Sequence, residues 1–355
     1  MKIDKSELAR KINRIKSTVP KKTPLEAIQG VLVEDGYLIA NNMETAVKVK
    51  LEASAGETFI IPARAFDLIN NLPNGEVEIK ADEASITIRI GSIKNKFAST
   101  GADQYPRPSV TKSEGTQSFE LDSESFVASL RRVAFAIADT AHNTMNALCL
   151  RAKDGKLNYI ALDGHIIAWD KVEYDGDFEL LIPKNAVEKL VSIGLTGKLT
   201  IEHSEFGALF ITDECEVSTR LVNGEFFNVE KAVTEGTMKT VAERAGLVDA
   251  INRARACMTA GTNTPVRMEL AEKAVSISIA VSTVNYSESV PLIRDMENPL
   301  TIAFDSRLLT ECLKAFDSEE VELSFSGPKM PLIIRDGESD FLTLILPVAL
   351  AAAGK

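Results

Sequence analysis

The sequence predicts an α+β protein built from three tandem copies of one domain, and two observations support this prediction. The stretch 59–106 combines a short apolar strand, a helix that opens at Pro62 and two alternating strands. The same order returns from Leu180 and again from Leu300, after intervals of about 120 residues. A period of this length indicates repeated domains, each with two helices on one side of an antiparallel sheet.

The predicted domains are residues 1–115, 116–236 and 237–355. A chain of 355 residues is long enough for each third to bury its own core. The polar stretch 107–117 reads as a linker after the first copy. Hairpin signals at Asp35-Gly36 and Asp154-Gly155 stand at equivalent places in the first two copies.

The first helix shows how the elements are inferred. Asp4 is the expected N-cap, and Glu7 completes a capping-box pattern. Leu8, Ile12 and Ile15 recur at helical spacing and form the expected buried stripe. The basic residues of this helix are expected on its remaining surface; they are Lys5, Arg10, Lys11, Arg14 and Lys16. The six predicted helices are 4–17, 62–72, 122–138, 183–193, 243–259 and 305–316.

Charge is distributed unevenly between the helices and the rest of the chain. The six helices carry 15 Lys or Arg against 10 Asp or Glu, a sum of +5. Because the net charge of the chain is −11, the rest of the chain carries −16. Helix faces that are not buried against the sheets would present positive potential to a polyanion such as nucleic acid. The alternative is that these charged faces are simply solvated.

Other features exclude several classes of protein. No apolar run reaches the roughly 20 residues that a membrane span needs. The N-terminus, Met1 to Lys5, lacks the apolar core of a secretion signal, so we expect a cytoplasmic protein. The four cysteines contain no Cys-x-x-Cys pair and are expected to be free, small buried side chains; they are Cys149, Cys215, Cys257 and Cys312.

An enzyme is the rival hypothesis, and the sequence gives it little support. His142, His165 and His203 have no metal-ligand spacing, and no glycine-rich phosphate-binding loop is present. Asp163 beside His165 resembles an acid–base pair, but a tight turn explains these residues better. We therefore expect no catalytic residue, no metal and no cofactor.

The repeated domain and three local motifs together resemble the bacterial DNA polymerase III β subunit family, the sliding clamps. The motifs are the strand-to-helix junction from Ile61 to Phe66, the turn Asp163-Gly164-His165 and the ending Ile345-Leu346-Pro347-Val348. The resemblance covers residues 1 to about 350. It implies a clamp fold and a head-to-tail homodimer that closes a six-domain ring, with helices lining a hole around duplex DNA.

The function that the resemblance implies is that of a non-catalytic processivity factor, which holds DNA by topology and without sequence readout. The implied partners are double-stranded DNA, the DNA polymerase III catalytic subunit, the clamp-loader ATPase complex and other proteins with clamp-binding motifs, with no membrane partner. The alternative is a clamp-like paralogue that scaffolds proteins without being loaded on DNA.

The resemblance also implies sites. Partner peptides would enter a cleft between the second and third domains, lined by Met145, Leu162, Gly164, His165, Ile167, Phe227, Ala232, Leu344, Leu346 and Val348. This chain departs from the family at Ile166, where Arg is usual, at Phe227, where Pro is usual, and at its C-terminal segment Leu346-Pro347-Val348-Ala349-Leu350, where a Met-rich, Arg-containing ending is usual. Without the family, these residues read as the edge of a core.

Two further sets of residues follow from the resemblance. Lys21 and Lys22 match a DNA-touching loop, and the helix residues Arg10, Arg14 and Arg131 are the other expected DNA contacts. Phe97, Cys257 and Met258 match the dimer interface, although core packing is the alternative for them.

Overall fold

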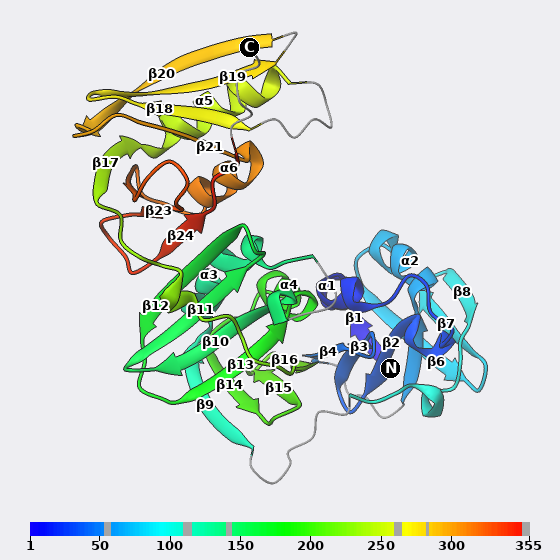
Figure 1. Ribbon diagram of the computed structural model, residues 1–355. Helices are drawn as coiled ribbons and strands as arrows, with labels where there is room; N and C mark the ends of the chain where they lie inside the picture. The colour runs from blue at the N-terminus through cyan, green and yellow to red at the C-terminus, as the bar shows by residue number, and fades with distance from the viewer. Residues whose placement is uncertain (53–57, 109–115, 140–143, 259–264, 282–283, 350–355) are drawn as a thin grey trace. The chain divides into compact units, whose positions relative to one another are not determined.

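The computed structural model describes residues 1–52, 58–108, 116–139, 144–258, 265–281 and 284–349 (Figure 1). Within these residues, one order of elements occurs three times: a strand, a helix, four strands, a second helix and three strands. The α+β class predicted from the sequence is confirmed.

The three copies follow one another along the chain. The first contains β1 (Lys2–Asp4), α1 (Lys5–Ile15), β2 (Gly30–Glu34), β3 (Tyr37–Asn41), β4 (Thr45–Lys50), β5 (Phe59–Pro62), α2 (Phe66–Asn71), β6 (Glu76–Asp82), β7 (Ser85–Ile90) and β8 (Ile93–Ala98). The second contains β9 (Gln117–Asp122), α3 (Ser123–Val133), β10 (Ala147–Lys153), β11 (Lys156–Leu162), β12 (Ile166–Glu173), β13 (Phe178–Pro183), α4 (Lys184–Ser192), β14 (Lys198–His203), β15 (Gly207–Ile211) and β16 (Cys215–Arg220). The third contains β17 (Met238–Glu243), α5 (Arg244–Ala256), β18 (Val266–Leu270), β19 (Ala274–Val281), β20 (Val284–Arg294), β21 (Leu300–Phe304), α6 (Ser306–Lys314), β22 (Glu320–Phe325), β23 (Leu332–Arg335) and β24 (Leu342–Ile345).

The chain divides into two compact units, and the division cuts through the second copy. Unit 1 comprises Met1–Ala128 and Asn185–Asn223, and unit 2 comprises Ser129–Lys184 and Gly224–Lys355. The boundaries of three separate domains therefore remain a prediction.

Sheets in both units join strands of neighbouring copies. Unit 1 holds the orders β1-β6-β7-β8 and β5-β2-β3-β4-β16-β15-β14-β9, and unit 2 holds β13-β10-β11-β12-β24-β23-β22-β17-β20-β19-β18-β21. The first and second copies meet where β4 pairs antiparallel with β16. The second and third copies meet in the same way, where β12 pairs antiparallel with β24.

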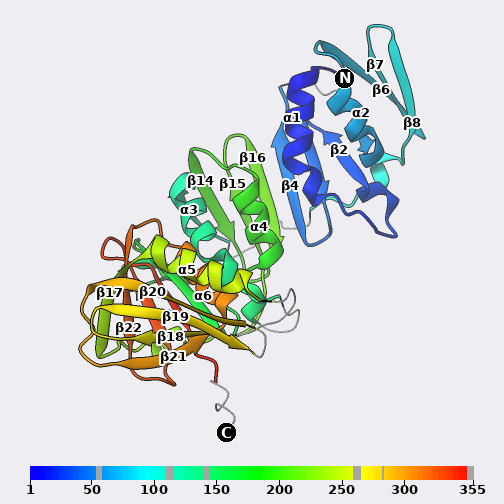
Figure 2. The same ribbon diagram turned by 90° about the horizontal axis from the view of Figure 1, so that it is seen from above.

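Helices cover these sheets in pairs. In Figure 2, α1 and α2 lie side by side in unit 1, and α5 and α6 lie side by side in unit 2. Lys5 Nζ donates to the carbonyl of Asn70 at 2.9 Å, which ties α1 to α2. None of the described helices is long and apolar enough to cross a membrane.

The first helix confirms most of its prediction. Asp4 Oδ1 accepts the backbone N–H groups of Ser6 and Glu7, as an N-cap does. Glu7 does not complete the capping box, because its carboxylate accepts the N–H of Glu52 instead. The stripe of Leu8, Ile12 and Ile15 is fully buried, as expected.

The prediction that all basic residues of the first helix lie on its exposed surface is wrong for Lys11. This residue is 1% exposed, and its ammonium group donates to Glu214 Oε2 at 2.7 Å. A buried charge is tolerated only when it is paired and hydrogen-bonded, and Glu214 supplies that partner from the turn before β16.

Candidate peptide cleft and DNA-facing cations

The predicted peptide cleft lies in unit 2, where several neighbouring strands of the sheet end. Leu162, at the end of β11, pairs with Ile167, near the start of β12. Ile166, at the start of β12, pairs with Ile345, at the end of β24. Because neighbouring strands are antiparallel, these strand ends and the start of β10 all lie at the same end of the sheet.

The turn between β11 and β12 is held by Asp163. Its Oδ1 accepts the backbone N–H groups of His165 at 2.8 Å and Ile166 at 2.9 Å. Gly164 takes φ = +91° in this turn, a conformation that favours glycine. The N–H of Leu346 then donates to the carbonyl of His165 at 2.8 Å, which fixes the chain after β24 beside the turn.

This use of Asp163 supports the turn explanation over an acid–base pair. The carboxylate oxygen is occupied by two backbone donors, and the His165 side chain is exposed. Among the described residues, no group of His, Cys, Asp and Glu could hold a metal ion. His142 lies outside the described residues.

The predicted cleft residues differ in exposure. Leu162, Ile167 and Leu344 are at most 6% exposed, so they form the edge of the core beneath the turn. Phe227 and Leu346 are large apolar side chains that are 46% and 40% exposed. Exposed apolar side chains above a packed edge suit a docking surface.

The remaining predicted cleft residues come from other segments of unit 2. Met145 is half-buried, and Thr144 beside it donates to the carbonyl of Glu225, two residues before Phe227. Ala232 follows a short 3₁₀ helix (Val229–Lys231) that Arg151 of β10 ties down through Glu230 at 3.0 Å.

Val348 lies after β24, two residues beyond Leu346. Its N–H donates to the carbonyl of Ala303 in β21 at 2.8 Å. This hydrogen bond fixes the segment after β24, which contains the predicted cleft residues Leu346 and Val348, to the third copy.

The predicted DNA contacts separate into two groups. Arg10, Lys21, Lys22 and Arg131 are exposed, and their cationic groups have no ion pair or hydrogen bond to the described part of the chain. Arg14 is different, because its guanidinium donates to the last carbonyls after α4, those of Ile193 at 2.6 Å and Gly194 at 2.7 Å. Arg14 therefore closes α4 and is a weaker candidate for a phosphate contact.

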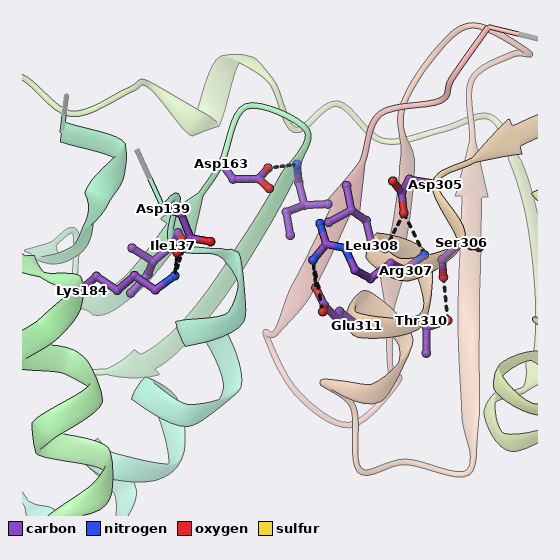
Figure 3. A network of polar contacts seen from close by, with 11 residues as sticks. Ile137, Asp139, Asp163, Lys184, Asp305, Ser306, Arg307, Leu308, Thr310 and Glu311 are labelled. Atoms are coloured by element: carbon purple, nitrogen blue, oxygen red, sulfur yellow. Dashed lines mark hydrogen bonds and ion pairs between the residues drawn. The ribbon is translucent and has the colours of Figure 1, made fainter. Parts of the chain in front are cut away.

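Other helix cations are also paired, so the positive sum overstates the free charge. Lys184 is ion-paired with Asp139, as Figure 3 shows. Arg253 of α5 makes a two-pronged contact with Glu288 of β20, at 2.9 and 2.6 Å. Arg253 and the hydroxyl of Tyr286 lower the pKa of Glu288 to about 2.

The predicted interface residues lie on an edge strand and at the end of a helix. Phe97 is half-buried on β8, and Met258 is half-buried after α5. Cys257 is exposed, so core packing is wrong for it, whereas the other three cysteines are buried as expected. Burial raises the pKa of the Cys215 thiol to about 12.

Sequence reasoning missed the two strands β8 and β20 themselves. Exposed polar residues alternate along both, Lys94 and Lys96 on β8 and Asn285 and Ser287 on β20. Their apolar pattern is therefore weak. The alternation of polar residues was the only signal in these segments that could have predicted a strand.

Known proteins support the interpretation of this fold. Residues 234–349 match the family described as the DNA polymerase III beta subunit, C-terminal domain. The beta sliding clamp of Synechococcus elongatus is 23% identical over 325 residues, which cover 87% of this chain and 85% of that protein. The resemblance to the sliding clamps is confirmed.

Solved structures extend this resemblance to the whole fold. A putative DNA polymerase III beta subunit from Eubacterium rectale has a TM-score of 0.89 at 23% identity, covering 98% of each chain. A sliding clamp (DNA polymerase III subunit beta) from Pseudomonas aeruginosa, bound to griselimycin, has a TM-score of 0.92 at 20% identity, covering 99% of each chain. The chain has the sliding-clamp fold.

Proposed function

We propose that this protein is a sliding clamp: a non-catalytic processivity factor whose head-to-tail homodimer encircles duplex DNA. It would tether the replicative polymerase and other partners that carry clamp-binding peptides. The observation that carries the proposal is a rule for joining copies, which leaves β8 of the first copy and the first part of β20 of the third copy each without a neighbouring strand on one side among the described residues.

The joining rule is visible at both internal junctions. The fourth strand of the first copy, β4, pairs with the last strand of the second, β16, and β12 pairs with β24 in the same way. The third copy has an equivalent of β4, which is β20, and the first copy has an equivalent of β16, which is β8. Within the described residues, β8 pairs only with β7. Along its length β20 pairs with β19, and β17 covers its other side only at Leu292 and Arg294, so the stretch 284–290 is open on that side in the part of the chain that the structure describes.

A second copy of the chain satisfies both open edges. Its β20 would pair with this β8, and its β8 with this β20, which closes a ring after two chains because each contact is head-to-tail. An open strand edge otherwise invites uncontrolled association.

The repeat also supplies the register of this pairing. Thr45 pairs with Thr219, and Ile166 pairs with Ile345. By position in its hairpin, Val284 of β20 is equivalent to Ile166, and Phe97 of β8 is equivalent to Thr219. We therefore pair Val284 of one protomer with Phe97 of the other.

The faces of the two strands agree with this register. Phe97 and Val284 are both half-buried, whereas the next pair, Lys96 and Asn285, consists of two exposed residues. Side chains alternate between the faces of a sheet, so a one-residue slip would set half-buried residues against exposed ones.

Paired cysteines test the register. In a Cys257→Ser background, Phe97→Cys with Val284→Cys should form a disulfide-linked dimer under mild oxidation, seen on a non-reducing gel. Phe97→Cys with Asn285→Cys is the matched control and should link far less, because its side chains face opposite sides. Equal linking of both pairs would contradict the register.

The free cations fit weak, sequence-independent DNA binding. Arg10, Lys21, Lys22 and Arg131 offer charge to phosphates, and phosphate contacts carry no sequence information. A ring held by topology needs few such contacts, so a protein with a net charge of −11 can still retain DNA.

Retention on DNA tests the topological part of the proposal. After loading by a clamp-loader complex, the protein should stay on nicked circular DNA and leave the same DNA once it is cut to a linear form. Equal lifetimes on both would refute encirclement. A cross-linked dimer that is never retained would favour the protein-scaffold alternative.

The cleft is the proposed docking site for partner peptides, with apolar anchors received by Leu346 and Phe227. A peptide that ends in Leu-Phe should bind, as measured by fluorescence anisotropy. His165→Ala combined with Leu346→Ala should weaken it about tenfold or more, because two exposed contact side chains are lost. Unchanged affinity would show that the cleft is misplaced.

A further inference from the structure

The junction between the first and second copies contains a counterpart of the peptide cleft. A small hollow in unit 1 lies where β4 meets β16. The residues that matter in its lining are Asn41, Met43, Glu44, Arg107, Ser218 and Arg220. This hollow therefore lies at the junction position that corresponds to the predicted cleft at β12 and β24.

Hydrogen bonds establish the equivalence of the turns at the two junctions. Asn42 Oδ1 accepts the N–H groups of Glu44 at 3.0 Å and Thr45 at 2.8 Å, as Asp163 Oδ1 does in the cleft. The N–H of Arg220 donates to the carbonyl of Glu44 at 3.3 Å, as Leu346 does to His165. Met43 thus stands at the position of Gly164, and Arg220 at that of Leu346.

Met43 occupies a position that a glycine fills more easily. Its φ is +76°, while Gly164 has φ = +91° in the equivalent turn. The Met43 side chain is 45% exposed. Strained backbone at an exposed position is found mainly at functional sites, and a long, adaptable thioether suits a docking surface.

Of the two arginines that line this hollow, Arg220 is the one whose side chain can pair with a ligand. Arg107 is already ion-paired with Glu34 at 2.6 Å. The guanidinium of Arg220 is exposed, with no partner for its side chain among the described residues. The one nearby acid in the lining, Glu44, accepts a hydrogen bond from Asn185 Nδ2 at 3.3 Å.

We propose that this hollow is a second docking site, which takes a short acidic peptide segment of a partner protein. A carboxylate of the peptide would pair with Arg220, and a neighbouring apolar side chain would lie against Met43. The site differs in kind from the apolar cleft, because a cation replaces Leu346. It depends neither on ring closure nor on DNA.

Anisotropy with two labelled peptides tests the proposal on the full-length protein. One peptide alternates Asp or Glu with Leu, and the other carries Asn or Gln at the acidic positions. The acidic peptide should bind and the neutral one should bind much more weakly. Arg220→Gln should weaken the acidic peptide about ten- to a hundredfold, the range of a charge-assisted hydrogen bond. Arg89→Gln is the matched control, because Arg89 is an exposed cation on β7 of the same unit.

Methionine-methyl NMR locates the bound peptide. The Met43 methyl signal should shift and saturate with the acidic peptide, and the signal of Met145 beside the apolar cleft should stay. Met43→Gly, which suits the positive φ, should keep the fold and weaken binding. A shift at Met145 alone, or equal binding by wild type and Arg220→Gln, would overturn the proposal. Either result leaves the DNA-retention and ring-closure tests unaffected.

Discussion

The ion pair between the buried Lys11 and the half-exposed Glu214 gives the sharpest test of how unit 1 is held together. The ammonium of Lys11 is enclosed, with 2% of its side chain exposed, whereas the Glu214 side chain is 49% exposed. Removing the partner of a buried charge costs about 3–5 kcal/mol when both groups are enclosed. Water reaches half of Glu214, so we expect about 1–3 kcal/mol for Glu214→Ala.

Lys11→Met should behave differently. Methionine has a similar length and carries no charge, so it fills the same space without needing a partner. The expected change in the free energy of unfolding is within about 1 kcal/mol, since apolar replacement of a buried charge is often neutral. The double variant Lys11→Met, Glu214→Ala should therefore be more stable than Glu214→Ala alone.

Urea unfolding can assign the loss to unit 1. The protein has one tryptophan, Trp169, and it lies in unit 2. In Glu214→Ala, the transition seen by far-ultraviolet circular dichroism should gain an earlier component, shifted by about 1 M urea, at a typical slope of about 2 kcal/mol per M. The Trp169 fluorescence transition should stay. If Lys11→Met lost as much as Glu214→Ala, or if the Trp169 transition shifted equally, the reasoning would be refuted.

The same pair predicts a dependence on pH. The hydrogen bond from Lys11 lowers the pKa of Glu214 below its usual 4.5. Its contribution to stability is therefore present above about pH 4.5 and is lost as the pH falls through the lowered value. Wild type and Glu214→Ala should converge in stability at acidic pH.

Three further predictions concern single residues. Arg10→Ala should lower the salt dependence of DNA binding by about one phosphate contact and should change the free energy of unfolding little. Arg14→Ala should instead lower the free energy of unfolding in urea by about 1–2 kcal/mol, because two carbonyl groups lose their hydrogen-bond donor. Asp163→Ala should weaken the Leu-Phe peptide in anisotropy and leave DNA retention unchanged, since two turn N–H groups lose their acceptor. Arg253→Gln should raise the pKa of Glu288 from about 2 toward its usual 4.5, measured by NMR titration.

The helices and tight turns of this protein were predictable because their signals are local. The apolar spacing that ends at Ile15 located α1, and Asp35-Gly36 and Asp154-Gly155 do take the positive φ values that such hairpins need. These features depend on residues within a few positions of one another.

The cross-chain contacts were not predictable, because they join residues far apart. Lys11 belongs to a helix whose pattern leaves its side chain on a polar face, and only Glu214, 203 positions away, makes its burial possible. Arg14 reaches carbonyls about as distant. The pairing of β4 with β16 likewise joins two strands that are each complete by their own pattern.

Comparison of the copies with one another separates fold from function where the single pattern does not. Asn42 and Asp163 both accept two backbone N–H groups, so the residue that builds the turn keeps its role in both copies. The outward positions of the same turn have diverged, since Met43 stands where the other copy has Gly164. The acceptor residue keeps the shape of the turn, whereas the residue after it differs between the copies and is part of the proposed recognition surfaces. On the two docking sites proposed above, one scaffold would offer an apolar surface at one junction and a charged hollow at the other.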